Sequence, residues 1–253
     1  MNEKLKNQKP WGILPILLFL GVWEIITRSG IIAGNLFFPP FSTVVEEFYR
    51  LIMNGVLLNN LLRSLIRVLI GFSFGSLAGL IVGIVMGWNE TFNRAFHPIF
   101  SLLYPIPALG WLPILLLWFG IGEILPITII FICSFFPVLY NTVTGIKTVN
   151  REFITVAETL GAPKFKILTS IALPLALPNI FTGLRLEAGM AWRVIIAAEM
   201  IAIPTGIGAL LMKAESLLRI DIIVVCLMVL SLMCFCFEKF FLILEKRLTC
   251  NWR

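Results

Sequence analysis

Four ionisable residues lie within one apolar stretch, residues 179–203. Of all the residues in the sequence, these point most clearly to a chemical role. They are Arg185, Glu187, Arg193 and Glu199. A charge at the centre of a bilayer is costly, roughly 2.5 to 3.5 kcal/mol for arginine on an insertion scale, so such charges face the interior of a helical bundle. The spacings put neither Arg185 with Glu187 nor Arg193 with Glu199 on one helical face. Their partners are therefore expected on other helices or on another subunit.

Arg193 lies near the middle of this stretch beside Trp192, and two interpretations of it stay open. Its guanidinium keeps its proton, so it could assist the passage of an anion. A buried ion pair with Glu24, Glu187 or Glu199, of this or a partner chain, is the alternative, because an unpaired central arginine would be costly. Trp192, Arg193 and Glu199 are therefore candidates for lining a solute pathway.

The remaining residues do not indicate metal or nucleophile chemistry. The single histidine, His97, has no companion at ligand spacing, and Cys234 and Cys236 project about 200° apart around a helix. The sequence contains no G-x-x-x-x-G-K-[ST] phosphate loop. We expect no metal site, no cofactor and no ATP hydrolysis by this chain itself. The five cysteines are interpreted as reduced packing residues: Cys133, Cys226, Cys234, Cys236 and Cys250.

Composition places all of these residues in a membrane protein. Of 253 residues, 59% are hydrophobic and 13% charged, and the mean hydropathy is +0.97. A hydrocarbon core of roughly 30 Å takes about 20 apolar residues per helix. We therefore expect an all-α transmembrane bundle, a single domain over residues 1–253, with about six spans. The spans are placed near 11–27, 65–87, 97–119, 124–146, 179–203 and 222–244.

Lysine and arginine are distributed unevenly between the two sides of these spans. The side that holds both termini and residues 151–178 carries the larger share, which predicts that this side is cytoplasmic. The net charge of +6 follows from this topology and gives no ground for nucleic-acid binding. Trp23 and Glu24 lie within the first span and no small-residue cleavage site follows it, so it is not expected to be a cleaved signal.

Five glycines recur at every fourth position of the second predicted span. Small residues at this period make a smooth groove into which the backbone of a neighbouring helix can come close. The repeat predicts tight helix packing, and a surface for sliding motion is a compatible interpretation. The glycines are Gly71, Gly75, Gly79, Gly83 and Gly87.

The third predicted span, 97–119, is interrupted by Pro105, Pro107 and Pro113. Each proline removes a backbone hydrogen bond and clashes with the preceding turn. Irregular backbone at membrane depth is tolerated where it is buried in protein or lines an aqueous path. Pro105 and Pro107 are therefore pathway candidates, with a kink that does not contact solute as the alternative.

Residues 151–178 form a polar insert between two apolar stretches and are predicted to fold as two short helices joined by a glycine turn. Asn150 can cap the first helix, Gly161 supplies its C-terminal stop, and Pro174 is expected to end the second helix. The helical period separates an apolar face, Phe153, Val156, Ala157 and Leu160, from a polar one, Arg151, Thr155, Glu158 and Thr159.

This insert resembles the EAA loop of the permeases of ATP-binding-cassette importers. In that pattern EAA is followed by three residues, Gly, nine residues and I-x-L-P, and Ala157, Gly161, Ile171 and the Leu-Pro pair at 173–174 fall in register. Thr155 and Val156 replace the Glu and the first Ala, so Glu158 is the candidate for the charged contact. The Ala-Glu-Met run at 198–200 and the Gly-x-Gly at 206–208 are similar to the nitrate, sulfonate and taurine branch.

The resemblance implies a permease subunit in a bacterial cell membrane. It would pair with a second copy and work with two cytoplasmic ATPases and an external solute-binding protein, importing a small anionic solute. Bicarbonate or a vitamin precursor is the alternative cargo; a channel, a secondary carrier and a membrane-embedded enzyme are the other classes considered. The residues implied in ATPase coupling are Phe153, Ala157, Glu158, Leu160, Gly161 and Lys164.

Overall fold

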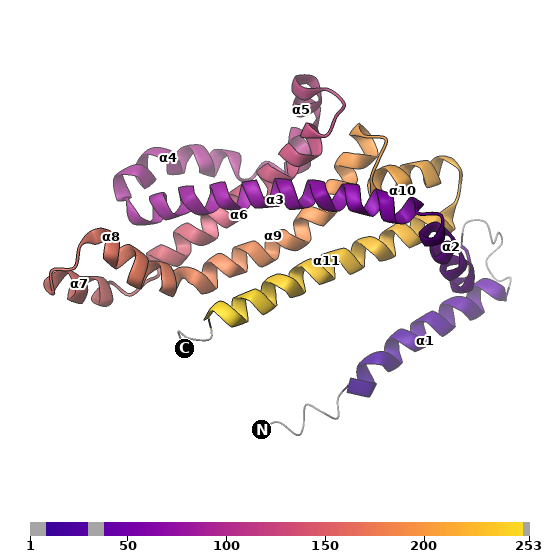
Figure 1. Cartoon of the computed structure of the whole chain (residues 1–253), viewed down its shortest axis with the longest axis horizontal. Helices are drawn as coiled ribbons and strands as arrows, with labels where there is room; N and C mark the ends of the chain where they lie inside the picture. Colours follow the sequence, from indigo (N-terminus) through magenta and orange to yellow (C-terminus); the bar gives the residue numbers. More distant parts are fainter. Residues whose placement is uncertain (1–8, 30–37, 250–253) are drawn as a thin grey trace.

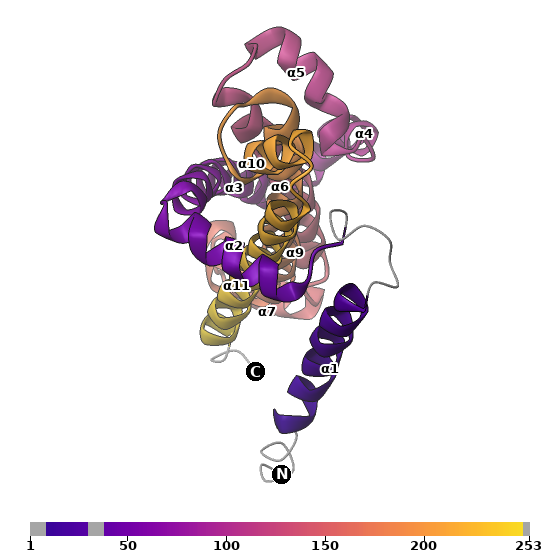
Figure 2. The same cartoon turned by 90° about the vertical axis from the view of Figure 1, so that its right-hand side faces the viewer.

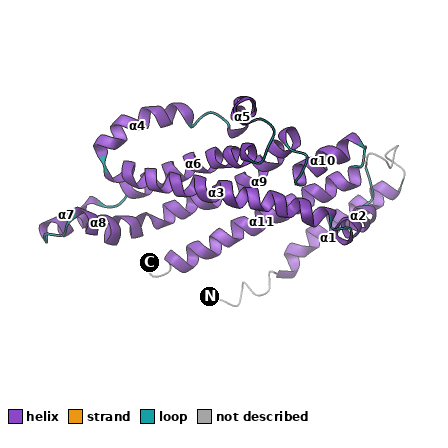
Figure 3. Cartoon of the chain, turned by 45° about the horizontal axis from the view of Figure 1, so that its top comes forward, coloured by secondary structure: helices purple, strands orange, loops and turns teal. Residues whose placement is uncertain are grey.

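The computed structural model describes residues 9–29 and 38–249, and this part of the chain contains helices and loops but no strand (Figures 1 and 3). Cys250 and both ends of the predicted 1–253 domain lie outside the described residues. In chain order the helices are α1 (Lys9–Arg28), α2 (Phe41–Met53), α3 (Val56–Trp88), α4 (Glu90–Leu103), the 3-10 helix η1 (Ala108–Trp111), α5 (Leu112–Phe119), α6 (Ile124–Lys147), α7 (Arg151–Thr159), α8 (Lys164–Ile167), the π-helix η2 (Leu168–Ala172), α9 (Leu173–Ala202), α10 (Ile207–Ser216) and α11 (Ile220–Thr249).

Four long helices, α3, α6, α9 and α11, lie side by side and form the bundle (Figures 1 and 2). The pair α7–α8 lies at one end of the bundle, and α10 lies toward the other (Figure 1). Within the described chain, four helical segments are long and apolar enough to cross a membrane, and the bent pair α4 with η1–α5 makes a fifth if it counts as one span. The all-α membrane fold is thereby confirmed. The four segments are Val56–Trp88, Ile124–Lys147, Lys164–Ala202 and Ile220–Leu248.

Helix α1 takes the place of the first predicted span, and it lies apart from the bundle, beside α2 (Figures 1 and 2). Helix α3 contains the second predicted span, 65–87, and extends beyond it at the N-terminal end. Helix α3 begins at Val56, directly after Gly55, whose φ of 69° lies in the left-handed region and turns the chain out of α2. The additional turns of α3 include Ser64, which belongs to the ion network described below.

The third predicted span is two helices rather than one. Helix α4 and the η1–α5 segment meet at an angle of 82°. Pro105 and Pro107 lie in the break, where Pro107 has an extended backbone with φ −56° and ψ 137° before η1 begins. Pro113 lies in the first turn of α5, where a missing N–H has no helical partner to lose. The proline pattern therefore predicted a real break.

The second helix of the 151–178 insert does not end at Pro174, and that prediction was wrong. The chain is helical without interruption over the 39 residues Lys164–Ala202. Residues Leu168–Ala172 form a π-helical turn, and Pro174 lies in the first turn of α9 directly after it. A π turn widens the helix and shifts its hydrogen bonds to i→i+5, which accommodates the proline ring and its missing donor.

The glycine repeat of α3 faces α6. A Cβ added at Gly75 or Gly79 would lie 2.5 Å from the carbonyl oxygen of Phe131 or Phe135, and at the other three glycines 2.7 to 2.9 Å from an α6 atom. Contacts this short leave no room for a side chain, so the glycines set the distance between two membrane helices. The other three are Gly71, Gly83 and Gly87.

Candidate functional site

The exposed face of the α7–α8 pair is apolar. Phe153, Val156 and Leu160 have 56%, 59% and 82% of their surface exposed. Together with Ile171 and Leu175 they line a groove of about 570 Å³, and Ala157, nine-tenths buried, lies against its floor. Apolar side chains in such numbers at the tip of a polar helix pair mark an interaction surface. The apolar face predicted from the helical period is thus exposed, apart from Ala157.

Glu158 and Lys164 line a different cavity, on the polar side of the helix pair. This cavity of about 600 Å³ lies between α7–α8 and the ends of α3, α4 and α6, and Arg94 and Arg151 line it as well. Glu158 therefore lies away from the apolar groove and among several cations. The two groups of predicted coupling residues belong to opposite faces of one helix pair.

Gly161 connects the two helices. The Asn150 side chain caps α7 by accepting a hydrogen bond from the backbone N–H of Glu152 at 3.0 Å, as predicted. At the other end Gly161 has φ 79°, and its N–H donates to the carbonyl oxygen of Glu158 at 2.9 Å. A Cβ added at Gly161 would meet no atom within 4 Å. The requirement for glycine is therefore one of backbone conformation and not of space.

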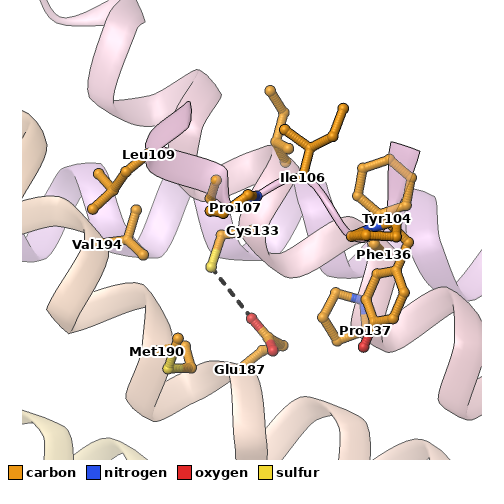
Figure 4. Close-up of a pocket in the computed structure, with 13 residues that line it drawn as sticks. Tyr104, Ile106, Pro107, Leu109, Cys133, Phe136, Pro137, Glu187, Met190 and Val194 are labelled. Atoms are coloured by element: carbon orange, nitrogen blue, oxygen red, sulfur yellow. Dashed lines mark hydrogen bonds between the residues drawn. The ribbon is translucent and has the colours of Figure 1, made fainter. Parts of the chain in front are cut away.

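The break between α4 and η1 opens onto a cavity of about 280 Å³ (Figure 4). Pro105 and Pro107 form part of its wall together with neighbouring residues of the break and of η1, and α6 and α9 supply the other lining residues. Of the pathway candidates, these two are brought together here, whereas Trp192, Arg193 and Glu199 are not among the lining residues. The lining consists of Tyr104, Pro105, Ile106, Pro107, Ala108, Leu109, Ile132, Cys133, Phe136, Pro137, Glu187, Met190 and Val194.

Glu187 on α9 and Cys133 on α6 face each other in this cavity (Figure 4). The Cys133 thiol donates to the Glu187 carboxylate, with 3.4 Å between Sγ and Oε2. Glu187 is 6% exposed. A carboxylate is thus held in a small, mostly apolar cavity at the broken span.

Glu199 lies in a buried ion network between α3, α9 and α10. Its side chain is fully buried, and its Oε1 lies 2.7 Å from Nη1 of Arg67, which is 2% exposed. Ser64 donates to the same carboxylate at 2.8 Å, and the backbone N–H of Gly208 at 3.0 Å. Full hydrogen bonding of this kind is what makes a buried ion pair tolerable.

The Gly-x-Gly at 206–208 packs closely against Glu199 and the end of α9. A Cβ at Gly206, where φ is 112°, would overlap the carboxylate of Glu199, and a Cβ at Gly208 would overlap the carbonyl oxygen of Ile196. The loop that follows α9 can therefore close over Glu199 only if both positions lack a side chain.

Arg67 also holds the loop between α5 and α6. Its Nη2 lies 2.7 Å from Oε1 of Glu123, and its two terminal nitrogens donate to Thr205 at 2.8 Å. The hydrogen bond from Arg67 to Glu123 holds the pKa of this exposed carboxyl below its usual value. One guanidinium thus joins the loop before α6, the loop after α9 and the buried carboxylate of Glu199.

Trp192 and Arg193 lie on different sides of α9. Trp192 is 2% exposed and packs edge-on against Phe237 of α11 in the main core. Arg193 is exposed, contacts the sulfur of Met190 at 3.4 Å and lines a cavity of about 290 Å³ with Glu238 of α11. The acidic partners proposed for Arg193 are otherwise engaged in the described chain: Glu24 with Arg28, Glu187 with Cys133 and Glu199 with Arg67.

Cys133 and Arg67 were not among the predicted site residues. Cys133 was interpreted as a packing residue, since a lone thiol in an apolar run carries no signal of its own. Arg67 could have been found, because it is an arginine within the glycine-containing apolar stretch and must have an acidic partner there. Its partner Glu199 was already a candidate, and the two are 132 residues apart in the sequence.

Comparisons with known proteins agree with this architecture. A family model described as "Binding-protein-dependent transport system inner membrane component" matches residues 71–249. The taurine transport system permease protein of Escherichia coli is 34% identical over 250 residues, which are 97% of this chain and 90% of that protein. An ABC transporter permease protein of Methanocaldococcus jannaschii is 46% identical over 135 residues, 53% of this chain and about half (51%) of that protein.

The fold also has a solved counterpart. A chain from inward-facing structures of the MetNI methionine ABC transporter aligns with a TM-score of 0.59 and 15% identity, over 73% of this chain and 94% of that one. The likeness concerns the arrangement of helices. Taken with the family match and the nearly full-length relative, it leads to one conclusion: the chain belongs to the binding-protein-dependent transport system inner membrane components, the permease subunits of ABC transporters.

Proposed function

We propose that this chain is the permease of an ATP-driven importer of small sulfonates or related anions, working as a homodimer in a bacterial cell membrane. Two cytoplasmic ATPases and an external solute-binding protein complete the assembly. Both termini and the α7–α8 pair lie in the cytoplasm, as the uneven distribution of lysine and arginine predicts. The cargo assignment is supported by the similarity to a taurine permease; bicarbonate or a vitamin precursor is the alternative.

The observation that carries this proposal is the apolar groove on α7–α8. Its side chains project from a helix pair whose other face is polar, and they have no covering element in the described chain. Such a groove needs a protein partner, and an ATPase that changes shape on binding ATP would move α7–α8 with it. Phe153, Val156 and Leu160 form the apolar contact, and Gly161 sets the angle between the two helices.

Solute passage is assigned to the side of the bundle where the α4–η1 break lies. Irregular backbone at membrane depth is tolerated where it lines an aqueous path, and the cavity beside the break supports this assignment. Helix α9 connects this cavity to α8, because the helical chain is continuous from Lys164 to Ala202. Movement imposed on α8 by an ATPase would therefore reach the cavity wall. A channel or secondary carrier would not need an exposed groove of this kind.

Two neighbouring substitutions on α7 test the coupling. Val156→Asp places a carboxylate in the groove, whereas Thr155→Asp places the same group on the polar face of the same helix; both positions are exposed. We expect Val156→Asp to abolish co-purification with the ATPase and ATP-driven taurine uptake by proteoliposomes. Thr155→Asp should retain both.

Two results would contradict the proposal. One is a Val156→Asp protein that binds its ATPase and imports as the wild type does. The other is transport by this chain alone, without ATPase or nucleotide, which would favour a carrier.

A further inference from the structure

The cavity at the broken span has one carboxyl group and no basic group in its described lining. Glu187 provides the carboxylate, and the other lining residues are apolar except for the Tyr104 hydroxyl and the Cys133 thiol. Within the described chain, the carboxylate accepts one side-chain hydrogen bond, from the thiol at 3.4 Å. A thiol is a weak donor, so most of the hydrogen-bonding capacity of the carboxylate is unused.

Two aromatic rings in the cavity lining also favour a positively charged group. Tyr104 and Phe136 both line the cavity, with ring centroids 6.3 Å apart. Figure 4 shows both rings at the same end of the cavity. Aromatic faces carry partial negative charge and attract cations, including ammonium groups of ligands. Carboxylate and rings together make the cavity attractive to a positively charged group and repulsive to a simple anion.

Arg193 lines a separate cavity on the α11 side of α9, and its guanidinium contacts the sulfur of Met190 rather than the Glu187 carboxylate. No lysine or arginine is among the described residues that line the cavity around Glu187. The volume, about 280 Å³, is ample for an aminoalkyl group.

We propose that Glu187 is the subsite for the ammonium group of the transported solute, and that the permease therefore favours aminosulfonates and related zwitterions over simple anions. This inference rests on the proposed importer function and narrows its cargo. The carboxylate would accept hydrogen bonds from the ammonium group, and Tyr104 and Phe136 would contact its methylene groups. Nitrate and bicarbonate, which have no such group, would meet repulsion at this point.

Cys133 offers a direct measurement of the charge preference, because its sulfur lies next to the carboxylate. The purified wild-type permease–ATPase complex is treated with aminoethyl or sulfonatoethyl methanethiosulfonate, and labelling of each cysteine is followed by mass spectrometry. Cys236, exposed on α11, serves as the internal reference. We expect the cationic reagent to be favoured at Cys133 by about tenfold more than at Cys236, as for a nearby opposite charge in a partly dehydrated site. Glu187→Gln should remove the excess, and Glu187→Asp should keep it.

Transport provides the second measurement. Taurine and ethanesulfonate differ by the amine alone, and uptake of each is measured in proteoliposomes containing the full complex with its binding protein. Glu187→Gln should lower taurine uptake about tenfold and should not lower ethanesulfonate uptake, because the repulsion of a simple anion is removed with the charge. Equal loss of both would show that Glu187 is structural, and equal retention of both would show that the solute does not meet it. Either result overturns the proposal.

A wild-type protection experiment keeps the test valid if Glu187→Gln does not fold. Taurine should slow the labelling of Cys133, whereas ethanesulfonate at the same concentration should not. Equal protection, or none, contradicts the ammonium subsite. If neither sulfonate is imported although cationic labelling is favoured and an amine protects, the importer cargo is wrong while the subsite stands. Failure of the ammonium subsite and failure of the proposed importer cargo therefore give different results.

Discussion

Replacing Gly79 with alanine should destabilise the contact between α3 and α6. The added Cβ would lie 2.5 Å from the carbonyl oxygen of Phe135, whereas ordinary contacts begin at 3.4 Å, so the two helices must separate by about 0.9 Å. A backbone oxygen cannot rotate away, so the upper part of the overpacking range, about 3 kcal/mol, applies. The better helix propensity of alanine returns about 1 kcal/mol. The net loss is then about 2 kcal/mol.

The assay is thermal unfolding of the purified permease in detergent, with Gly21→Ala as the matched control. Gly21 lies in α1, where an added Cβ meets nothing within 4 Å. For a chain of this size, about 2 kcal/mol corresponds to a fall in Tm of about 4 to 8 °C for Gly79→Ala. Gly21→Ala should show no fall. Gly79→Leu, with a larger side chain, should reduce the yield of folded complex.

One outcome would refute this reasoning. If Gly79→Ala and Gly79→Leu both give fully active complexes with unchanged Tm, the α3–α6 distance is not set by this glycine. The surface would then be free to slide or to face lipid, and the repeat would need another explanation.

Three further predictions concern Gly161 between α7 and α8, Glu123 in the loop between α5 and α6, and Arg193 of α9. Gly161→Val should leave membrane insertion intact but abolish transport-coupled ATP hydrolysis, because a β-branched residue at φ 79° costs roughly 1 to 2 kcal/mol of backbone strain; wild-type coupling would contradict it. Glu123→Gln should lower Tm above pH 4.5, the usual pKa of the carboxyl, because the variant lacks the ion pair with Arg67. The difference from wild type should vanish as pH falls through the lowered folded-state pKa, since protonation of Glu123 then removes the ion pair from the wild type as well; a pH-independent difference would exclude this ion pair. Arg193→Gln should lose assembly, measured by size-exclusion chromatography, and a second change, Glu238→Gln, should restore it; a well-assembled Arg193→Gln complex with slowed anion import would instead assign the arginine to passage, and unchanged import would defeat both interpretations.

Local features of the fold could be predicted because their causes are local. The Asn150 cap and the left-handed Gly161 are short-range hydrogen-bond requirements, and both are found where the sequence places them. The break at Pro105 and Pro107 follows from the absence of backbone donors. Long apolar runs predicted the membrane-spanning helices, because bilayer thickness fixes the length that a span must have.

Long-range features could not be predicted, since nothing in the local sequence encodes which charges meet. The pair Arg67–Glu199 joins residues 132 apart, and Cys133–Glu187 joins residues 54 apart. The π turn before Pro174 was missed for another reason. A proline ends a helix in most contexts, and the insertion of one extra residue into a turn leaves no compositional trace.

The continuous helical segment from Lys164 to Ala202 connects the α7–α8 pair, the cavity at the broken span and the Arg67–Glu199 ion pair. At 1.5 Å per residue, 39 residues extend roughly 58 Å, well beyond the roughly 30 Å of a hydrocarbon core. Its first residues belong to the α7–α8 pair, its middle carries Glu187, and Glu199 near its end is locked to Arg67. A displacement applied at α8 would therefore be transmitted along the Lys164–Ala202 helical segment, whose far end is held by the Arg67–Glu199 ion pair. The cavity wall that carries Glu187 lies between these two points and would move.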